Sequence, residues 1–328
     1  MRAMASNVLT LLIAGGIVLL AAIGVAQQQV SSQGPAAEAV RISVARGAAF
    51  DRVAEDLEAA GVIESLWLFR VAGRYTGKAA ELKFGDYEIP AGASMTEILD
   101  LLASGGNVFY SVTVAPGMTV SMAVDRLNGI DTLSGEVAEL PPEGSMFPDT
   151  WNYERGGDRN VIIERMQTRM TEVLDAAWEA RAEDLPLTDK EQLLILASII
   201  EKETRPEEHG KVASVFVNRL KKGMKLQTDP TVIYGITLGK APLGRGLRRS
   251  ELAKSTPYNT YVIQGLPPTP IANPSAESIR AAANPETTPY LYFVADGTGG
   301  HAFAETLEEH NRNVAAWRRI ERSRNQDN

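Results

Sequence analysis

The stretch TDKEQLLILASIIEKET (188–204) decides how the larger part of this chain folds. Its first and fourth residues have the spacing of a capping box, which predicts a helix from Asp189 to about Glu203. Pro206 disfavours helical geometry at the residue before it, so the helix ends there. Because the middle of the stretch is almost wholly apolar, we expect this helix to be buried on nearly every side.

Two carboxylates, Glu201 and Glu203, stand at the end of this helix. At 100° per residue they point about 200° apart, so they do not pair on one helix face. Apolar neighbours and the negative end of a helix both disfavour the ionised form of a glutamate placed here. A carboxyl group still protonated near neutral pH suits general-acid cleavage of a glycosidic bond. The alternative is an ordinary solvated helix end, and the helix geometry does not choose between the two.

Composition excludes several classes of function. The chain has 328 residues, a length that allows about two domains, and a formal net charge of −8. An acidic chain lacks the basic surface of a general nucleic-acid binder, so no nucleic-acid partner is expected. Cysteine is absent, and the three histidines do not have the spacing of a metal site. We therefore expect no metal and no cofactor, which leaves the chemistry to carboxylates.

The N-terminus contains one strongly apolar run. Val8–Ala26 comprises nineteen residues without a charge, and as a helix it would be about 28 Å long, close to the thickness of a bilayer core. Arg2 precedes the run and no basic residue follows it before Arg41. This pattern predicts a single-pass anchor in the cytoplasmic (inner) membrane, with a cytoplasmic N-terminus and a periplasmic or extracytoplasmic remainder. A cleaved signal peptide ending near Ala26 is the alternative.

The patterns along the chain predict an α+β protein with a transmembrane helix, a small α+β module and a larger mixed α/β catalytic domain. We expect a cytoplasmic tip and anchor over 1–26, a polar linker over 27–39, the module over 40–105, a connecting strand and helix over 106–139, and the catalytic domain over 140–328.

The module shows strand, helix and strand patterns in succession. Strands are predicted at 40–44 and 84–90, a helix at 49–60, and a further helix behind the capping box Ser94–Glu97. A strand–helix–strand unit that ends in FGDYEIPAG (84–92) resembles a divergent LysM-type module, which implies glycan binding. A purely structural module fits the same pattern.

Six further stretches carry a second resemblance: EGSMFPDTW (143–151), ASIIEKET (197–204), KVASVFVNRL (211–220), LQTDPTVIYG (226–235), TPYNTYVIQGLPPTPIANPS (256–275) and TPYLYFVADGTGGHAFAETLEEHN (288–311). Together they strongly resemble the endolytic murein transglycosylase family (MltG/YceG-like) over nearly all of 140–315. The resemblance implies a membrane-anchored lyase that cuts peptidoglycan glycan strands internally. It also implies that Glu201 is the catalytic acid/base, and it is the resemblance that favours Glu201 over Glu203.

The implied reaction is a non-hydrolytic cleavage between MurNAc and GlcNAc that leaves a 1,6-anhydroMurNAc end and terminates elongation of a nascent strand. One carboxyl group suffices, because the attacking hydroxyl belongs to the substrate, whereas a usual glycoside hydrolase needs two. The implied partners are peptidoglycan strands and peptidoglycan synthases. Two alternatives stay open: a non-catalytic, membrane-anchored peptidoglycan-binding protein and a muramidase that uses water.

Polar and aromatic loop residues are the candidate substrate contacts. Hydroxyl, amide and ring groups on rigid loops suit a glycan cleft. Each has a structural alternative: an Asx-type turn, a loop tie, core packing or a hairpin edge. The predicted contacts are Gln227, Thr228, Asp229, Tyr234, Asn259, Tyr261, Glu143 and His301.

Overall fold

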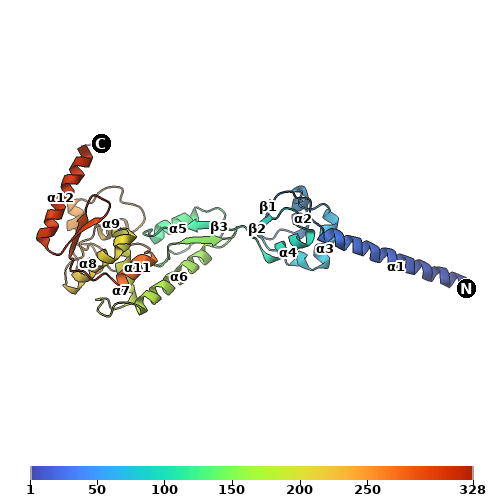
Figure 1. Cartoon of the computed structure of the whole chain (residues 1–328), viewed down its shortest axis with the longest axis horizontal. Coiled ribbons are helices and arrows are strands. Elements are labelled where there is room, and N and C mark those ends of the chain that lie inside the picture. Colours follow the sequence, from blue (N-terminus) through green and yellow to red (C-terminus); the bar gives the residue numbers. More distant parts are fainter. Residues whose placement is uncertain (1, 327–328) are drawn as a thin grey trace. The chain divides into compact units, whose positions relative to one another are not determined.

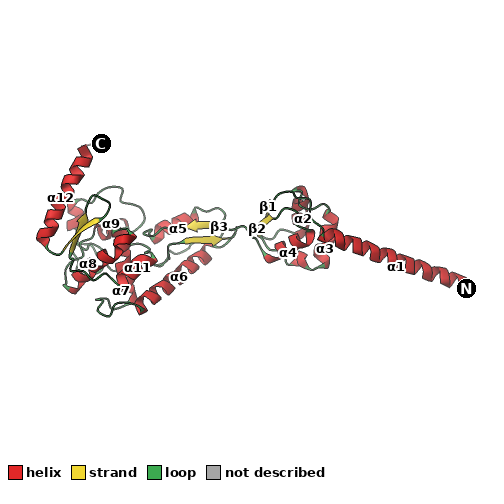
Figure 2. Cartoon of the chain, viewed as in Figure 1, coloured by secondary structure: helices red, strands yellow, loops and turns green. Residues whose placement is uncertain are grey.

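The computed structural model describes residues 2–326 and mixes helices with short strands (Figures 1 and 2). The chain forms two compact units. The first contains the residues up to Ser111 together with Asn152–Gly157, and the second contains Val112–Trp151 and the residues from Asp158 onward. The strands form three two-stranded sheets, β1–β2, β3–β4 and β5–β6. β3 (Tyr110–Thr113) and β4 (Thr150–Tyr153) each pass from one unit into the other.

The first unit otherwise contains α1 (Arg2–Ser31), β1 (Val40–Val44), α2 (Phe50–Ala59), α3 (Leu66–Tyr75), η1 (Lys78–Ala80), β2 (Gly85–Ile89) and α4 (Met95–Ser104). The second otherwise contains α5 (Val120–Asn128), α6 (Arg159–Glu179), α7 (Lys190–Glu203), η2 (Pro206–Glu208), α8 (His209–Lys221), α9 (Asp229–Thr237), α10 (Arg249–Ala253), α11 (Ala276–Ala283), β5 (Tyr292–Ala295), β6 (His301–Ala304) and α12 (Leu307–Gln326).

Helix α1 is the one helix among the described residues that is long and apolar enough to cross a membrane. It continues to Ser31, although the sequence suggested a linker from Gln27. The reason is packing: Ala26 and Val30 lie against the core of the first unit. The chain that follows is also held, because the Gly34 amide donates to the Gly92 carbonyl at 3.1 Å.

The first unit builds its core under an antiparallel ribbon. β1 pairs with β2 so that Val40 lies opposite Ile89, and α2, α3 and α4 contribute the remaining core residues. The predicted capping box is confirmed: the Ser94 side chain accepts from Glu97 N, and the Glu97 side chain accepts from Ser94 N. The sequence analysis did not identify α3, although its buried residues, Leu68, Phe69, Ala72 and Gly73, recur at helical spacing.

The second unit is organised around α7, and the predicted buried helix is confirmed. Its N-cap is Asp189, whose side chain accepts from Gln192 N at 2.8 Å. α7 packs against α6, α8, α9 and α11. Even Ser198, a polar residue in the middle of the helix, is buried; its hydroxyl donates to the Ile195 carbonyl at 2.7 Å and accepts from Ile271 N at 3.0 Å.

Shortening a core side chain of α7 tests this packing. Leu196 is fully buried in the core of the second unit, so Leu196→Ala should lower the free energy of unfolding by about 2–5 kcal/mol. Leu140, an exposed leucine of the same unit, is the matched control, and Leu140→Ala should change it by less than about 0.5 kcal/mol. Denaturant unfolding of the detergent-solubilised chain measures both. Equal losses in the two variants would contradict a buried α7.

Candidate active site

The carboxyl group of Glu201 is occupied by the start of α11. Its Oε2 accepts from the Ser275 amide at 2.9 Å and from the Ser275 hydroxyl at 2.6 Å, and the Ser278 hydroxyl donates to the same oxygen. Ser275 is the N-cap of α11, and a negative charge is favourable at a helix N-terminus. Glu201 therefore ties α11 to α7 through three hydrogen bonds.

The carboxyl group of Glu203 lies in a different environment, as the opposite directions on the helix predict. Glu203 is the last residue of α7 and is partly buried. Burial raises the pKa of Glu203 to about 7. The Thr228 hydroxyl donates a hydrogen bond to Glu203, which lowers this pKa but does not cancel the effect of burial. The negative charge of Asp229 acts in the same direction as burial, whereas His301 and Arg219 favour the ionised form. Near neutral pH a large fraction of Glu203 is therefore protonated.

The turn before α9 brings a second carboxylate beside Glu203. The Tyr261 hydroxyl donates to Asp229 Oδ1 at 2.7 Å, while the Thr228 amide donates to the Thr260 hydroxyl at 3.0 Å. Gln227 has a positive φ of 52°, an uncommon conformation for a residue other than glycine. Gln227 and Asp229 are exposed although Thr228 between them is buried, so the turn presents two polar groups to solvent beside the protonated acid.

Arg219 supplies a buried cation to the same cluster. Its Nε donates to the Leu291 carbonyl at 2.6 Å and its Nη1 to the Leu226 carbonyl at 2.7 Å. Charged side chains are rarely buried unless they are paired or hydrogen-bonded. These bonds satisfy the guanidinium and hold the loop before α9 against the β5 edge, which fixes the position of Thr228 over Glu203.

His301 approaches Glu203 from β6 and is held by Glu208. His301 Nδ1 lies 2.7 Å from Glu208 Oε2, and its amide donates to Glu208 Oε1 at 3.0 Å. The Thr204 hydroxyl, next in sequence to Glu203, also donates to Glu208 Oε2 at 3.0 Å. Burial disfavours the Glu208 carboxylate, but the bonds from His301 and Thr204 together hold the pKa of Glu208 below its usual value.

Two of the expected contacts form a separate pair. The Tyr234 hydroxyl donates to Glu143 Oε2 at 3.1 Å, and the Val120 amide donates to Glu143 Oε1 at 2.9 Å. Burial raises the pKa of Glu143 and outweighs these bonds. This pair holds the start of α5.

Asn259 is buried and ties down its own loop. Its Nδ2 donates to three backbone carbonyls, those of Glu251, Leu252 and Lys254. Its Oδ1 accepts from the Tyr261 amide at 3.0 Å, which positions Tyr261 beside Asp229. The geometry thus fits the loop-tie alternative for Asn259.

The structure gathers Thr228, Asp229, Tyr261 and His301 around Glu203, and it adds two residues that the sequence reasoning missed. Arg219 lay within a recognised motif, but a basic residue at a helix end reads as solvated unless its burial is known. Glu208 lies in a polar stretch that the sequence suggests is exposed. Only the fold brings it to His301, which is 93 positions farther along the chain.

The chain that carries the cluster around Glu203 is similar to known proteins. A family model described as "YceG-like family" matches residues 42–316. The chain belongs to the YceG-like family.

Two similar proteins with assigned names are both endolytic murein transglycosylases. The chain is 31% identical over 307 residues to an endolytic murein transglycosylase of Bacillus subtilis, with 83% of each chain covered. It is 27% identical to an endolytic murein transglycosylase of Streptococcus pneumoniae, matching 84% of this chain and 58% of that one. Among solved structures, a yceG-like protein from Listeria monocytogenes superposes with a TM-score of 0.51 at 29% identity, covering 84% of this chain and 99% of that one.

Removing the Thr228 hydroxyl tests the environment of Glu203. The side chain of Thr228 makes no cap bond to α9 and donates to Glu203, so Thr228→Val should raise the pKa of Glu203 by about one unit. Carboxyl-carbon NMR titration of glutamate-labelled protein measures the change. Thr113→Val, on the exposed surface of the same unit, should leave it unchanged. A pKa of Glu203 that falls or stays constant in Thr228→Val would refute the described bond.

Proposed function

We propose that this chain is a lyase that cuts peptidoglycan glycan strands internally, as an endolytic murein transglycosylase. Membership of the YceG-like family and the names of the relatives support the reaction class. The observation that carries the proposal is the family match over residues 42–316. The structure adds a candidate acid at the end of a buried helix and beside exposed polar groups, because burial raises the pKa of Glu203 to about 7. A carboxyl group with a pKa near the working pH is the acid that glycosidic cleavage requires.

We propose Glu203 as the acid/base, whereas the motif resemblance implies Glu201; the paired amide variants described below separate the two carboxyl groups. Glu201 Oε2 accepts three hydrogen bonds from Ser275 and Ser278, which hold the side chain against α11. Glu203 accepts the hydroxyl bond of Thr228, and His301 and Arg219 also favour its ionised form. Burial and the negative charge of Asp229 outweigh them and raise the pKa of Glu203 to about 7.

In the proposed reaction one carboxyl group acts first as the acid and then as the base. Glu203 protonates the oxygen between MurNAc and GlcNAc, and the C1–O bond breaks as positive charge develops at C1. The carboxylate that results accepts the proton of the MurNAc C6 hydroxyl, whose oxygen bonds to C1 and closes the 1,6-anhydro ring. Glu203 regains its proton and no water is consumed. In this proposal the exposed carboxylate of Asp229, beside Glu203, stabilises the developing positive charge.

In this proposal the exposed residues beside Glu203 hold the substrate. Gln227 and Asp229 offer amide and carboxylate groups to sugar hydroxyls and acetamides, and Tyr261 orients Asp229. Thr228 and His301 act on Glu203, while Glu143, Tyr234 and Asn259 support the surrounding loops.

The first unit completes the proposal. Helix α1 anchors the chain in the cytoplasmic membrane with the N-terminus inside, and the module that follows binds glycan in the manner of a LysM-type unit. The anchor keeps the catalytic unit beside nascent strands and their synthases. The single apolar helix supports the anchor, and the β1–β2 ribbon with its helices supports the module.

A hydrolytic muramidase is the second candidate, because Asp229 lies close enough to influence the pKa of Glu203. Two carboxylates near one bond are the arrangement that hydrolases use. The two reactions differ by one water in their products, and mass spectrometry of the released glycans separates them. Anhydro ends support the lyase, and reducing ends support the hydrolase.

Paired amide substitutions test the assignment of the acid. Glu203→Gln removes the proton that is transferred, so cleavage of purified glycan strands should fall by roughly 10²–10⁴-fold. Glu201→Gln keeps an acceptor for the serines and should retain most activity, at a stability cost of about 1 kcal/mol. Chromatography with mass detection follows both. A variant Glu203→Gln with wild-type cleavage, or loss confined to Glu201→Gln, would return the role to Glu201.

The pH dependence of cleavage gives a signed test. With the pKa of Glu203 at about 7, kcat/KM should fall about tenfold per pH unit above that value. Asp229→Asn removes a negative charge that raises the pKa of Glu203, so the alkaline limb should move to lower pH. An alkaline limb that moves to higher pH in Asp229→Asn would contradict the described electrostatics.

A further inference from the structure

Helix α3 of the first unit carries an exposed apolar stripe that the proposed reaction does not use. Trp67, Val71 and Tyr75 are 71%, 42% and 86% exposed. They are spaced four residues apart, so they lie along one side of the helix. Trp67 and Tyr75 thus expose a large aromatic side chain at each end of a short helix. Exposed apolar surface of this kind marks an interaction site.

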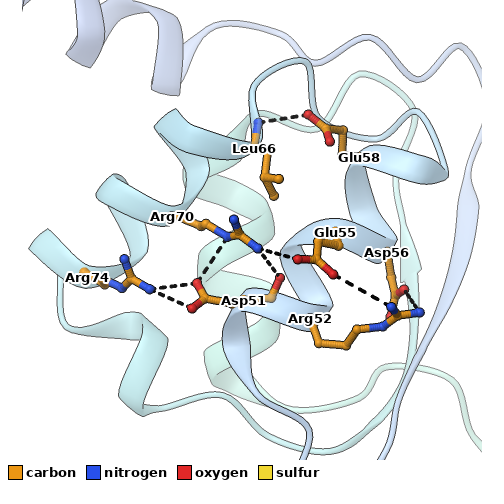
Figure 3. A network of polar contacts seen from close by, with 8 residues as sticks. All are labelled: Asp51, Arg52, Glu55, Asp56, Glu58, Leu66, Arg70 and Arg74. Atoms are coloured by element: carbon orange, nitrogen blue, oxygen red, sulfur yellow. Dashed lines mark hydrogen bonds and ion pairs between the residues drawn. The ribbon is translucent and has the colours of Figure 1, made fainter.

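The stripe is held outward by its neighbours on the same helix. Leu68 and Phe69 are buried in the core of the unit. On the other flank, Arg70 and Arg74 both pair with Asp51 of α2, at 3.2 and 2.8 Å (Figure 3). Helix α3 cannot rotate to bury the stripe without breaking these ion pairs and exposing Phe69.

Helix α1 ends within the same unit and beside α3. The two helices are in contact (Figure 1), and Ala26 and Val30 of α1 lie against the core to which α3 contributes. The Val30 carbonyl accepts from the Thr96 hydroxyl at 3.3 Å. The Gly92 amide donates to the Ala36 carbonyl at 2.8 Å, so the chain after α1 has no slack.

This short attachment fixes how far the unit stands from a membrane that α1 crosses. The apolar run ends at Ala26, before three glutamines, and Val30 is about 6 Å farther along the helix. The headgroup layer of one leaflet is about 5–7 Å thick. The surface of the unit around the end of α1 must therefore enter that layer. Trp and Tyr are enriched at this depth, because each has an apolar ring and a polar edge.

We propose that Trp67, Val71 and Tyr75 form an interfacial face, which lies in the lipid headgroup layer on the outer side of the membrane and fixes the orientation of the first unit. The inference rests on the membrane anchor of the proposed function and does not depend on the cleavage reaction. We assign the lipid surface as the partner of this face, because α1 holds the first unit against the membrane.

Single-cysteine labelling tests the face in the full chain. The chain contains no cysteine, so Trp67→Cys and Tyr75→Cys each give one site for a nitroxide label. The control is Phe109→Cys: Phe109 is 62% exposed in the same unit, and the adjacent Val108 bonds to Asp86 of β2 rather than to the junction with α1. The proteins are reconstituted in vesicles of phosphatidylcholine and phosphatidylglycerol, and co-flotation verifies the anchor.

Power-saturation EPR then compares collisions with oxygen, which dissolves in lipid, and with a water-soluble nickel complex. The oxygen-to-nickel ratio should be several-fold higher at positions 67 and 75 than at position 109. Equal ratios at all three positions in floating samples would overturn the proposal, as would spin–spin broadening that reveals a second copy on the face. Failure to float would remove the anchor and this proposal together, while glycan cleavage by the same samples reports separately on the catalytic assignment.

Discussion

The desolvation of one carboxyl group at the end of α7 is the constraint on which the catalytic unit depends. α7 is surrounded by α6, α8, α9 and α11, and the Glu203 side chain in its last turn is partly buried. Glu203 keeps its proton there because ionisation in such a place is costly. Thr228, His301 and Arg219 limit that cost, so the pKa of Glu203 is about 7 rather than far higher.

The two glutamates of one motif illustrate how neighbouring side chains acquire different roles. Glu201 turns toward α11, where Ser275 and Ser278 donate hydrogen bonds to it. Glu203 turns toward the loop before α9, where burial and an adjacent carboxylate oppose ionisation. The first connects two helices of the core, and the second is the acid that we propose for proton transfer.

The sequence predicted much of this fold, because local signals determine it. The apolar run of α7, the Ser94–Glu97 capping box and the β5–β6 hairpin all follow from patterns within a few residues. The directions of Glu201 and Glu203 followed from helix geometry as well. The partners of those two groups did not, since Ser275 and Thr228 are 74 and 25 positions away from them. The continuation of α1 to Ser31 depends on packing that no local pattern contains.

Difference infrared spectroscopy of the carboxylic C=O stretch at pH 6 tests the central claim most directly, because it detects the protonated group itself. The account predicts a protonated carboxyl band in the wild type that persists in Glu201→Gln and disappears in Glu203→Gln. A band that persists in Glu203→Gln and disappears in Glu201→Gln would contradict it.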